Sequence, residues 1–257
     1  MKVGILAGGM GTRLAEETEI RPKPMVEIGP EPILWHIMKH YEHYGYHEFA
    51  IALGYKGDYI KRYFTEFHSR NSNLKVDLSS GVVDASRNGG EDWKVDLIET
   101  GRWTNTGGRI KRLAPYLGDD TFMLTWGDGL SNVNLDDLLV FHRRHGKLAT
   151  VTAVRPSARY GKLDLDGDVV VNFSEKPQLE EGWINGAFFV LEQKVFDYID
   201  DDDTQFEKEP LERLAKDGEL MAFRHEGFWQ CMDTLREKVI LQHMWESGSP
   251  AWKTWTS

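Results

Sequence analysis

The feature that most constrains this chain is a junction near its N-terminus, where a short apolar run enters a glycine-rich segment. The run from Lys2 to Ala7 predicts a buried strand, and Gly8-Gly9-Met10-Gly11 follows it directly. Glycines placed after a strand let backbone N–H groups approach an anion such as phosphate. We therefore expect a ligand-binding loop at the carboxyl end of the first strand.

Strands and helices are predicted to alternate along the rest of the chain. Helical apolar spacing follows Pro32 and ends at Gly45, and a second helix is expected from Asp58, as a capping residue, to Phe67. Further strands are expected at 49–53, 93–98, 121–126, 148–154, 169–173 and 183–191, and further helices near 205–216 and 233–245. This alternation predicts an α/β fold in which helices flank a mostly parallel, mixed sheet.

The chain shows no shift in composition that would mark a linker between domains. We therefore expect one domain over residues 1–257, with an excursion at about 68–106 and an aromatic tail at 250–257. Its formal charge of −10, from 31 basic and 41 acidic residues, argues against nucleic-acid or membrane partners. A single cysteine, Cys231, and the lack of an apolar run of about 20 residues or of a cleavable leader favour the cytoplasm.

Two basic residues accompany the glycine-rich segment. Arg13 ends the motif Gly8-Gly9-Met10-Gly11-Thr12-Arg13, and Lys23 lies in Pro22-Lys23-Pro24. Both can neutralise phosphate charge, so the pattern suits a triphosphate. A dinucleotide fingerprint would need glycine where Leu14 stands, and no Gly-Lys-Ser or Gly-Lys-Thr of a P-loop follows.

These two motifs resemble those of the sugar-1-phosphate nucleotidylyltransferases. The resemblance implies the Rossmann-like, glycosyltransferase A-type fold of that family and a nucleotide site with Arg13, Lys23 and Asp128 as catalytic residues. The implied nucleotide-binding residues are Leu6, Ala7, Gly8, Gly9, Gly11, Thr12, Arg13, Lys23, Thr106, Gly108, Arg109, Gly127 and Asp128.

Two aspartates match the metal-binding positions of the family. Asp128 lies in Trp126-Gly127-Asp128-Gly129 and Asp233 follows Cys231-Met232. Mg²⁺ prefers one or two carboxylates together with substrate phosphates and water, so the resemblance implies Mg²⁺ as cofactor. By itself the first motif is also typical of a turn, and Asp233 could serve as a helix N-cap.

A third group of residues resembles the sugar-phosphate segments of the family. Lys176 would bind the phosphate, and Glu175 and Asn185 would hydrogen-bond sugar hydroxyls. The full set is Tyr160, Gly161, Glu175, Lys176, Asn185 and Gly186.

Three segments resemble the cytidylyl branch of the family, namely 13–18, 32–38 and 252–255. The branch implies transfer of CMP from CTP to α-D-glucose 1-phosphate, giving CDP-glucose and pyrophosphate, in a bacterial route to surface polysaccharide. It also implies a homo-oligomer, with a hexamer as one candidate. Trp126 stands where tyrosine is expected. UTP or dTTP as substrate, and a non-catalytic regulatory subunit, remain open alternatives.

Several other patterns favour structural roles. His36, His40, His43 and His47 are expected in the core rather than at zinc, and Asp200–Asp203 in a solvated turn that caps the helix near Gln205. Asp164-Leu165-Asp166 fits a glycosyltransferase metal motif but precedes Gly167, as in a hairpin. The tail from Trp252 to Trp255 is hypothesised to pack on a neighbouring subunit.

Overall fold

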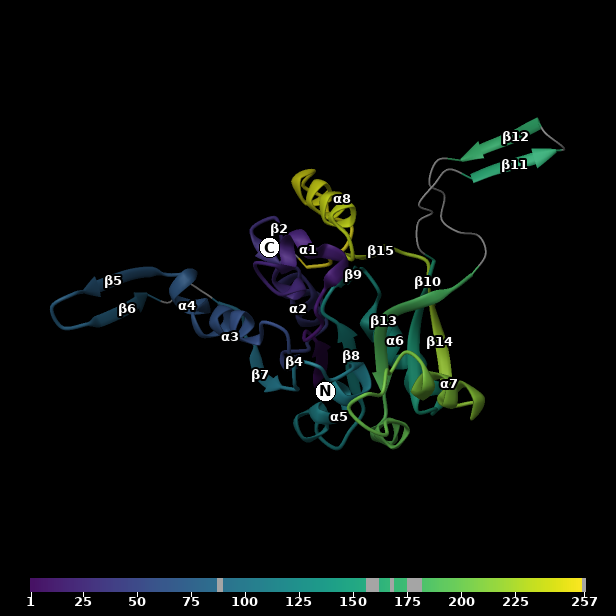
Figure 1. Ribbon diagram of the computed structural model, residues 1–257, viewed down its shortest axis with the longest axis horizontal. Coiled ribbons are helices and arrows are strands. Elements are labelled where there is room, and N and C mark those ends of the chain that lie inside the picture. The colour runs from purple at the N-terminus through teal and green to yellow at the C-terminus, as the bar shows by residue number, and fades with distance from the viewer. Residues whose placement is uncertain (87–89, 156–161, 167–168, 175–181, 256–257) are drawn as a thin grey trace.

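The computed structural model describes residues 1–86, 90–155, 162–166, 169–174 and 182–255 and is built on a central seven-stranded sheet (Figure 1). The strand order is β14-β10-β13-β8-β1-β4-β7, and only β13 runs antiparallel to its neighbours. The strands are β1 (Val3–Leu6), β4 (Glu48–Leu53), β7 (Lys94–Glu99), β8 (Phe122–Trp126), β10 (Ala149–Val154), β13 (Ile184–Leu191) and β14 (Leu220–His225). The predicted mostly parallel, mixed sheet is confirmed.

Helices cover both faces of this sheet. One apolar core contains Ile33 and Ile37 of α2, and the other contains Ile110 and Leu113 of α5. The longer helices are α2 (Ile33–His43), α3 (Gly57–Thr65), α5 (Thr106–Leu117), α6 (Leu135–His145), α7 (Glu209–Lys216) and α8 (Leu235–Glu246). Shorter ones are α1 (Ala15–Thr18), α4 (Phe67–Arg70) and the 3₁₀ helices η1 (Thr12–Leu14), η2 (Lys23–Met25) and η3 (Gln193–Tyr198). Across the described ranges, none of these helices combines the length and hydropathy that a membrane crossing requires.

Small two-stranded ribbons complete the fold. The excursion predicted at 68–106 contains β7 and an exposed hairpin that extends away from the sheet (Figure 1). The Asp164-Leu165-Asp166 segment ends a strand that pairs antiparallel with the next one, which confirms the hairpin. The ribbon strands are β5 (Asn73–Asp77) with β6 (Val82–Ser86), β11 (Lys162–Asp166) with β12 (Val169–Ser174), β2 (Glu27–Ile28) with β3 (Glu31–Pro32), and β9 (Gly129–Ser131) with β15 (Trp229–Cys231).

Strand β1 places the glycine-rich segment at the centre of the sheet. All four of its residues are buried, and Leu6 pairs in register with Ala52 of β4 and Trp126 of β8. Because the three strands are parallel, their carboxyl ends meet at one edge. The glycine-rich loop therefore lies beside Gly127 and Asp128, which follow β8.

Two predicted helix starts are wrong. Helix α3 begins at Gly57 after Lys56, which takes left-handed backbone angles (φ 52°), so Asp58 lies in the first turn and does not cap the helix. Helix α7 begins at Glu209 rather than near Gln205. The backbone carbonyls of Asp202 and Thr204 instead accept hydrogen bonds from the N–H groups of Asn105 and Gly107, so the acidic turn supports the start of α5.

The aromatic tail packs on its own chain rather than on a neighbouring subunit. Trp252 and Trp255 are only 1% and 8% exposed. The indole N–H of Trp252 donates to His36 Nδ1 (3.4 Å), and the Trp255 ring lies edge-on to Trp35 at 5.9 Å. The hypothesis that these rings serve an intersubunit contact is therefore corrected, because the core formed with α2 already buries them.

His36 and His40 of α2 are core residues, whereas His43 is exposed and His47 is half-buried, so the predicted core position is wrong for these last two. His36 donates through Nε2 to the carbonyl of Ile28 (2.8 Å), and His40 Nδ1 hydrogen-bonds to the hydroxyl of Thr254 (3.0 Å). No cluster of three or more histidine, cysteine or acidic side chains that could hold a metal occurs within the described residues. Burial and these hydrogen bonds give His36 and His40 a structural role.

These buried histidines predict a loss of stability in acid. Burial lowers the pKa of His36 to about 4 and that of His40 to about 3. Since both values lie below the unfolded value of about 6.5, the unfolded chain binds protons first as the pH falls. The contribution of these histidines to stability should therefore be fully present above about pH 6.5. We expect the free energy of unfolding, measured in urea, to fall by about 3 kcal/mol or more between that pH and about pH 4.

The matched variant is His36→Gln, which does not titrate but can donate and accept similar hydrogen bonds. Its unfolding free energy should fall less steeply between about pH 6.5 and pH 4 than that of the wild type. Equal slopes for the two proteins would contradict the role of His36.

Candidate active site

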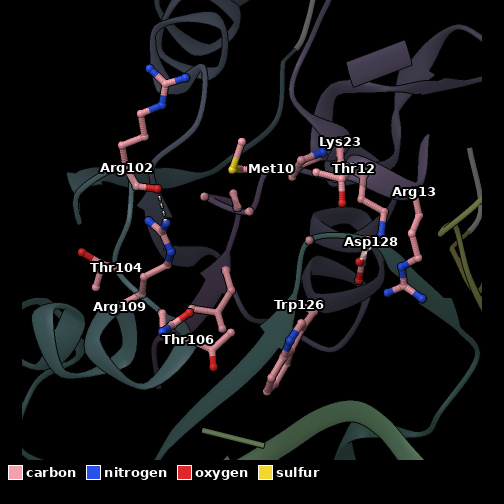
Figure 2. Close-up of a pocket in the computed structure, with 18 of the residues that line it drawn as sticks. Met10, Thr12, Arg13, Lys23, Arg102, Thr104, Thr106, Arg109, Trp126 and Asp128 are labelled. Atoms are coloured by element: carbon pink, nitrogen blue, oxygen red, sulfur yellow. Dashed lines mark hydrogen bonds and ion pairs between the residues drawn. The ribbon is translucent and has the colours of Figure 1, made fainter. Parts of the chain in front are cut away.

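A cavity of about 420 Å³ opens where the central parallel strands end. Figure 2 shows Lys23, Thr12, Arg13 and Asp128 gathered on one side of it and Arg102, Thr104, Thr106 and Arg109 on the other, with Trp126 between them. The predicted site residues that line it are Leu6, Ala7, Gly8, Gly9, Gly11, Thr12, Arg13, Lys23, Thr106, Arg109, Gly127, Asp128 and Asp233. Segments from the two ends of the sequence thus meet in one cavity.

Lys23 joins the two aspartates predicted to bind metal. Its ammonium nitrogen Nζ lies 2.6 Å from Asp128 Oδ2 and 2.5 Å from Asp233 Oδ1. Arg13 approaches the same cluster, with Nη1 3.0 Å from Asp233 Oδ2. The structure therefore brings together three residues that are distant in sequence. Lys23 precedes α2, Asp128 follows β8, and Asp233 follows β15.

The charges of this cluster stabilise one another. Burial favours the neutral form of Lys23, but the charges and hydrogen bonds of Asp128 and Asp233 outweigh it, so the pKa of Lys23 is raised. For Asp233, burial by itself would raise the pKa, because it favours the neutral carboxylic acid. Lys23 and Arg13 outweigh this effect and hold the pKa below its usual value. Lys23 is thus a cation and Asp233 an anion at neutral pH.

Asp233 is not the N-cap of the last helix. Thr234 caps α8 by accepting a hydrogen bond from the N–H of Glu237, whose carboxylate in turn accepts from the N–H groups of Asp233 and Thr234. This capping box supplies hydrogen-bond acceptors for the free backbone N–H groups at the start of the helix. The side chain of Asp233 is consequently available to face Lys23.

The donor set suits Mg²⁺. Two carboxylates converge on one cationic position, and hard divalent cations prefer oxygen ligands. The described residues supply no third acidic or histidine ligand to this cluster, so the protein forms a partial coordination shell rather than a closed cage. A magnesium ion that shares its ligands with substrate phosphates and water matches this arrangement.

Arg109 supports the glycine-rich loop from beneath. Its side chain is buried, and its Nη1 donates to the carbonyls of Leu53 and Gly101 and to the hydroxyl of Thr100. A Cβ at Gly8 would lie 2.3 Å from this nitrogen. Only a residue without a side chain can therefore let the loop pass over the guanidinium.

Three predicted residues do not line the cavity. Gly108 packs against the acidic turn, where a Cβ would lie 2.6 Å from Asp202 Cα, so its expected nucleotide contact is corrected. Asn185 accepts a hydrogen bond from the N–H of Ala187, and Gly186 is buried against the Thr152 backbone. The predicted sugar-phosphate residues Tyr160, Gly161, Glu175 and Lys176 lie outside the described residues.

Part of the cavity wall consists of residues that were not predicted from the sequence. Arg102, Trp103, Thr104 and Asn105 line it together with Met10 and Pro24. The first four belong to the loop between β7 and α5. Their position directly after a strand of a parallel sheet is the signal that could have identified them.

The close passage of the loop over Arg109 predicts unequal effects of two neighbouring substitutions. Gly8→Ala should lower the free energy of unfolding by about 1 to 3 kcal/mol, because the new methyl group forces the loop or the buried guanidinium to move. Gly9→Ala is the matched control, since a Cβ there meets nothing within 4 Å. Urea denaturation of both variants tests this, and equal stabilities would contradict the packing argument.

Sequence comparisons connect this geometry to known proteins. Residues 2–242 match the family described as "Nucleotidyl transferase". A protein of Salmonella typhi named "Glucose-1-phosphate cytidylyltransferase" is 50% identical over 99% of this chain and 100% of its own length. A protein of Bacillus subtilis named "Probable glucose-1-phosphate cytidylyltransferase" is 47% identical over the same shares of the two chains.

Solved structures agree with the fold. A structure of HddC from Yersinia pseudotuberculosis "complexed with GMP-PN" has a TM-score of 0.69 and 26% identity, and the match covers 95% of this chain and 99% of that one. A UDP-glucose pyrophosphorylase complexed with UDP-glucose matches with a TM-score of 0.68 over 96% and 98% of the chains. At 17% identity the second likeness concerns the fold alone.

Proposed function

Because this chain belongs to the nucleotidyl transferase family, we propose that it transfers CMP from CTP to α-D-glucose 1-phosphate, giving CDP-glucose and pyrophosphate. The observation that carries the proposal is the cluster of Lys23, Asp128 and Asp233 beside a glycine-rich loop. This combination supports the proposal, because a cation and two potential metal ligands lie beside backbone N–H groups of the kind that bind phosphate. The naming of the full-length relatives supports the choice of CTP and glucose 1-phosphate.

In the proposed reaction an oxygen of the sugar phosphate attacks the α-phosphorus of CTP in line. The new P–O bond forms as the bond to the oxygen that bridges to the β-phosphorus breaks, and pyrophosphate carries away that electron pair. No general base is needed, because the sugar phosphate is already ionised at neutral pH. The task of the protein is to hold two anions together and to neutralise their charge.

Each charged side chain has a part in this task. Arg13, whose side chain is largely exposed at the loop, stabilises the leaving pyrophosphate. Lys23 contacts the nucleotide phosphates, which replace the carboxylates as its partners. Asp128 and Asp233 would hold Mg²⁺. When bound, this ion supplies charge neutralisation at the phosphate oxygens.

The sugar-phosphate side of the proposal rests on the family resemblance. Lys176 would bind the phosphate of glucose 1-phosphate, and Glu175 and Asn185 its hydroxyls, with Tyr160, Gly161 and Gly186 beside them. A homo-oligomer in the cytoplasm, with a hexamer as one candidate, belongs to the same proposal.

Substitution of Asp128 tests the metal assignment. Asp128→Asn keeps the shape of the side chain but removes its charge, so we expect turnover with Mg²⁺ to fall about 100-fold or more. Asp119→Asn, in an exposed loop away from the cavity, is the matched control and should keep wild-type turnover. Near-normal turnover of a folded Asp128→Asn protein would contradict the assignment.

The substrate is tested by pyrophosphate release from purified protein with Mg²⁺ and glucose 1-phosphate. CTP, UTP, dTTP, ATP and GTP are supplied in separate reactions. We expect CTP to give the highest kcat/KM. A preference for UTP or dTTP would keep the reaction type but change the base, and nucleotide binding without release would favour a regulatory subunit.

A further inference from the structure

A carboxylate outside the cavity connects two of its walls. Glu207 lies between η3 and α7 and accepts hydrogen bonds through both oxygens. Its Oε1 accepts from the indole N–H of Trp126 (3.0 Å), and its Oε2 accepts from the hydroxyl of Thr106 (2.6 Å). Trp126 ends β8 and Thr106 begins α5, and both line the cavity, whereas Glu207 does not.

The carboxylate of Glu207 is exposed, but the residues on either side of its two hydrogen bonds are packed. Phe206, which precedes it, is fully buried, and the rings of Phe189 and Phe206 lie 5.2 Å and 6.4 Å from that of Trp126. The backbone carbonyl of Thr204 also accepts a hydrogen bond from the N–H of Gly107. The segment before α7 is thereby fastened to the start of α5, so Glu207 meets Thr106 in a defined geometry.

The hydrogen bonds of Thr106 fix the direction of its hydroxyl group. The hydroxyl donates its one proton to Glu207 and accepts from the N–H of Phe206 (2.9 Å). In the described part of the chain these are the two hydrogen bonds of this oxygen. A hydroxyl has one proton and two lone pairs, so the remaining lone pair of Thr106, a residue that lines the cavity, can act only as an acceptor.

The position of Thr106 in the cavity corresponds to the base rather than the phosphates. The charged cluster of Lys23, Asp128 and Arg13 occupies one side and suits the triphosphate, whereas Thr106 lies across the cavity from it (Figure 2). Because the cavity runs from Lys23 to the start of α5, a nucleotide whose phosphates meet Lys23 would have its base near Thr106. At that end a fixed acceptor distinguishes bases by the group they present to it.

We propose that Thr106, oriented by Glu207, selects the base by accepting a hydrogen bond from the exocyclic amino group of cytosine. Uracil presents a carbonyl at the same ring position, which would face a lone pair and leave both groups unpaired. Thr106 is then a specificity-determining residue and Glu207 a positioning residue. The inference rests on the proposed use of CTP and names the atom that would enforce it.

The substitution Glu207→Gln should reverse this polarity. The indole of Trp126 can only donate, so the oxygen of the new amide must face it and the NH₂ group must face Thr106. The Thr106 hydroxyl then accepts hydrogen bonds from this NH₂ group and from the N–H of Phe206, and its own proton is left to point into the cavity. A donor there favours the carbonyl of uracil over the amino group of cytosine.

The test is the ratio of kcat/KM for CTP to that for UTP, together with the ratio of the two binding affinities measured with Mg²⁺. Thr106→Val should lower both ratios about tenfold or more, because the amino group of cytosine loses its acceptor. Thr106→Ser keeps the hydroxyl and should keep the wild-type preference. Glu207→Gln should lower the ratios further than Thr106→Val, toward a preference for UTP.

Thr121→Val is the matched control, because its hydroxyl binds Glu192 outside the cavity, and its ratios should equal those of the wild type. General damage to the fold weakens the reaction with both nucleotides together and leaves the ratios unmoved. Wild-type preference in Thr106→Val would overturn this inference while leaving the proposed function intact. A wild-type protein that itself favours UTP would overturn both.

Discussion

The ion pairs between Lys23 and the two aspartates are the interaction on which the site depends. Asp128 and Asp233 carry like charges and would repel each other in a partly buried position without a cation between them. Lys23 supplies that charge and connects the loop after β8 to the segment before α8. The two carboxylates of the candidate metal site are therefore held close together by Lys23, without a bound metal ion.

This arrangement would let one cavity hold both a metal ion and a phosphate, as proposed. A lysine held by two carboxylates is a cation that phosphate oxygens can recruit, and the carboxylates it leaves are the ligands a hard divalent ion prefers. Across the cavity from them, the buried guanidinium of Arg109 ties the end of β4 to the loop before α5 and supports the glycine-rich loop. The glycine-rich loop thus contributes backbone to the cavity, and Lys23, Arg13 and Arg109 supply positive charge around it.

Much of the fold and of the site followed from local sequence patterns. The strand before Gly8 and the alternation of strands and helices were predictable because apolar spacing records which face of an element is buried. The glycine-rich motif, Lys23 and both aspartates were assigned by their likeness to a family, and the structure places all of them in one cavity. The errors occurred where a local rule had competitors, as at Lys56, whose left-handed backbone begins α3 in place of a cap by Asp58.

What the sequence by itself determined is the set of short-range features: a buried first strand, the loop that follows it and a lysine suited to phosphate. These depend on neighbouring residues, so they can be read along the chain. Only the tertiary structure decided that Thr234 caps α8, so that the side chain of Asp233 can pair with Lys23. It also decided that Trp252 packs in the core and donates a hydrogen bond to His36. In the same way, it brought the carboxylate of Glu207 to the hydroxyl of Thr106. Each of these choices requires partners distant in sequence, and a polar side chain takes whichever partner the packing of the whole chain brings within hydrogen-bond distance.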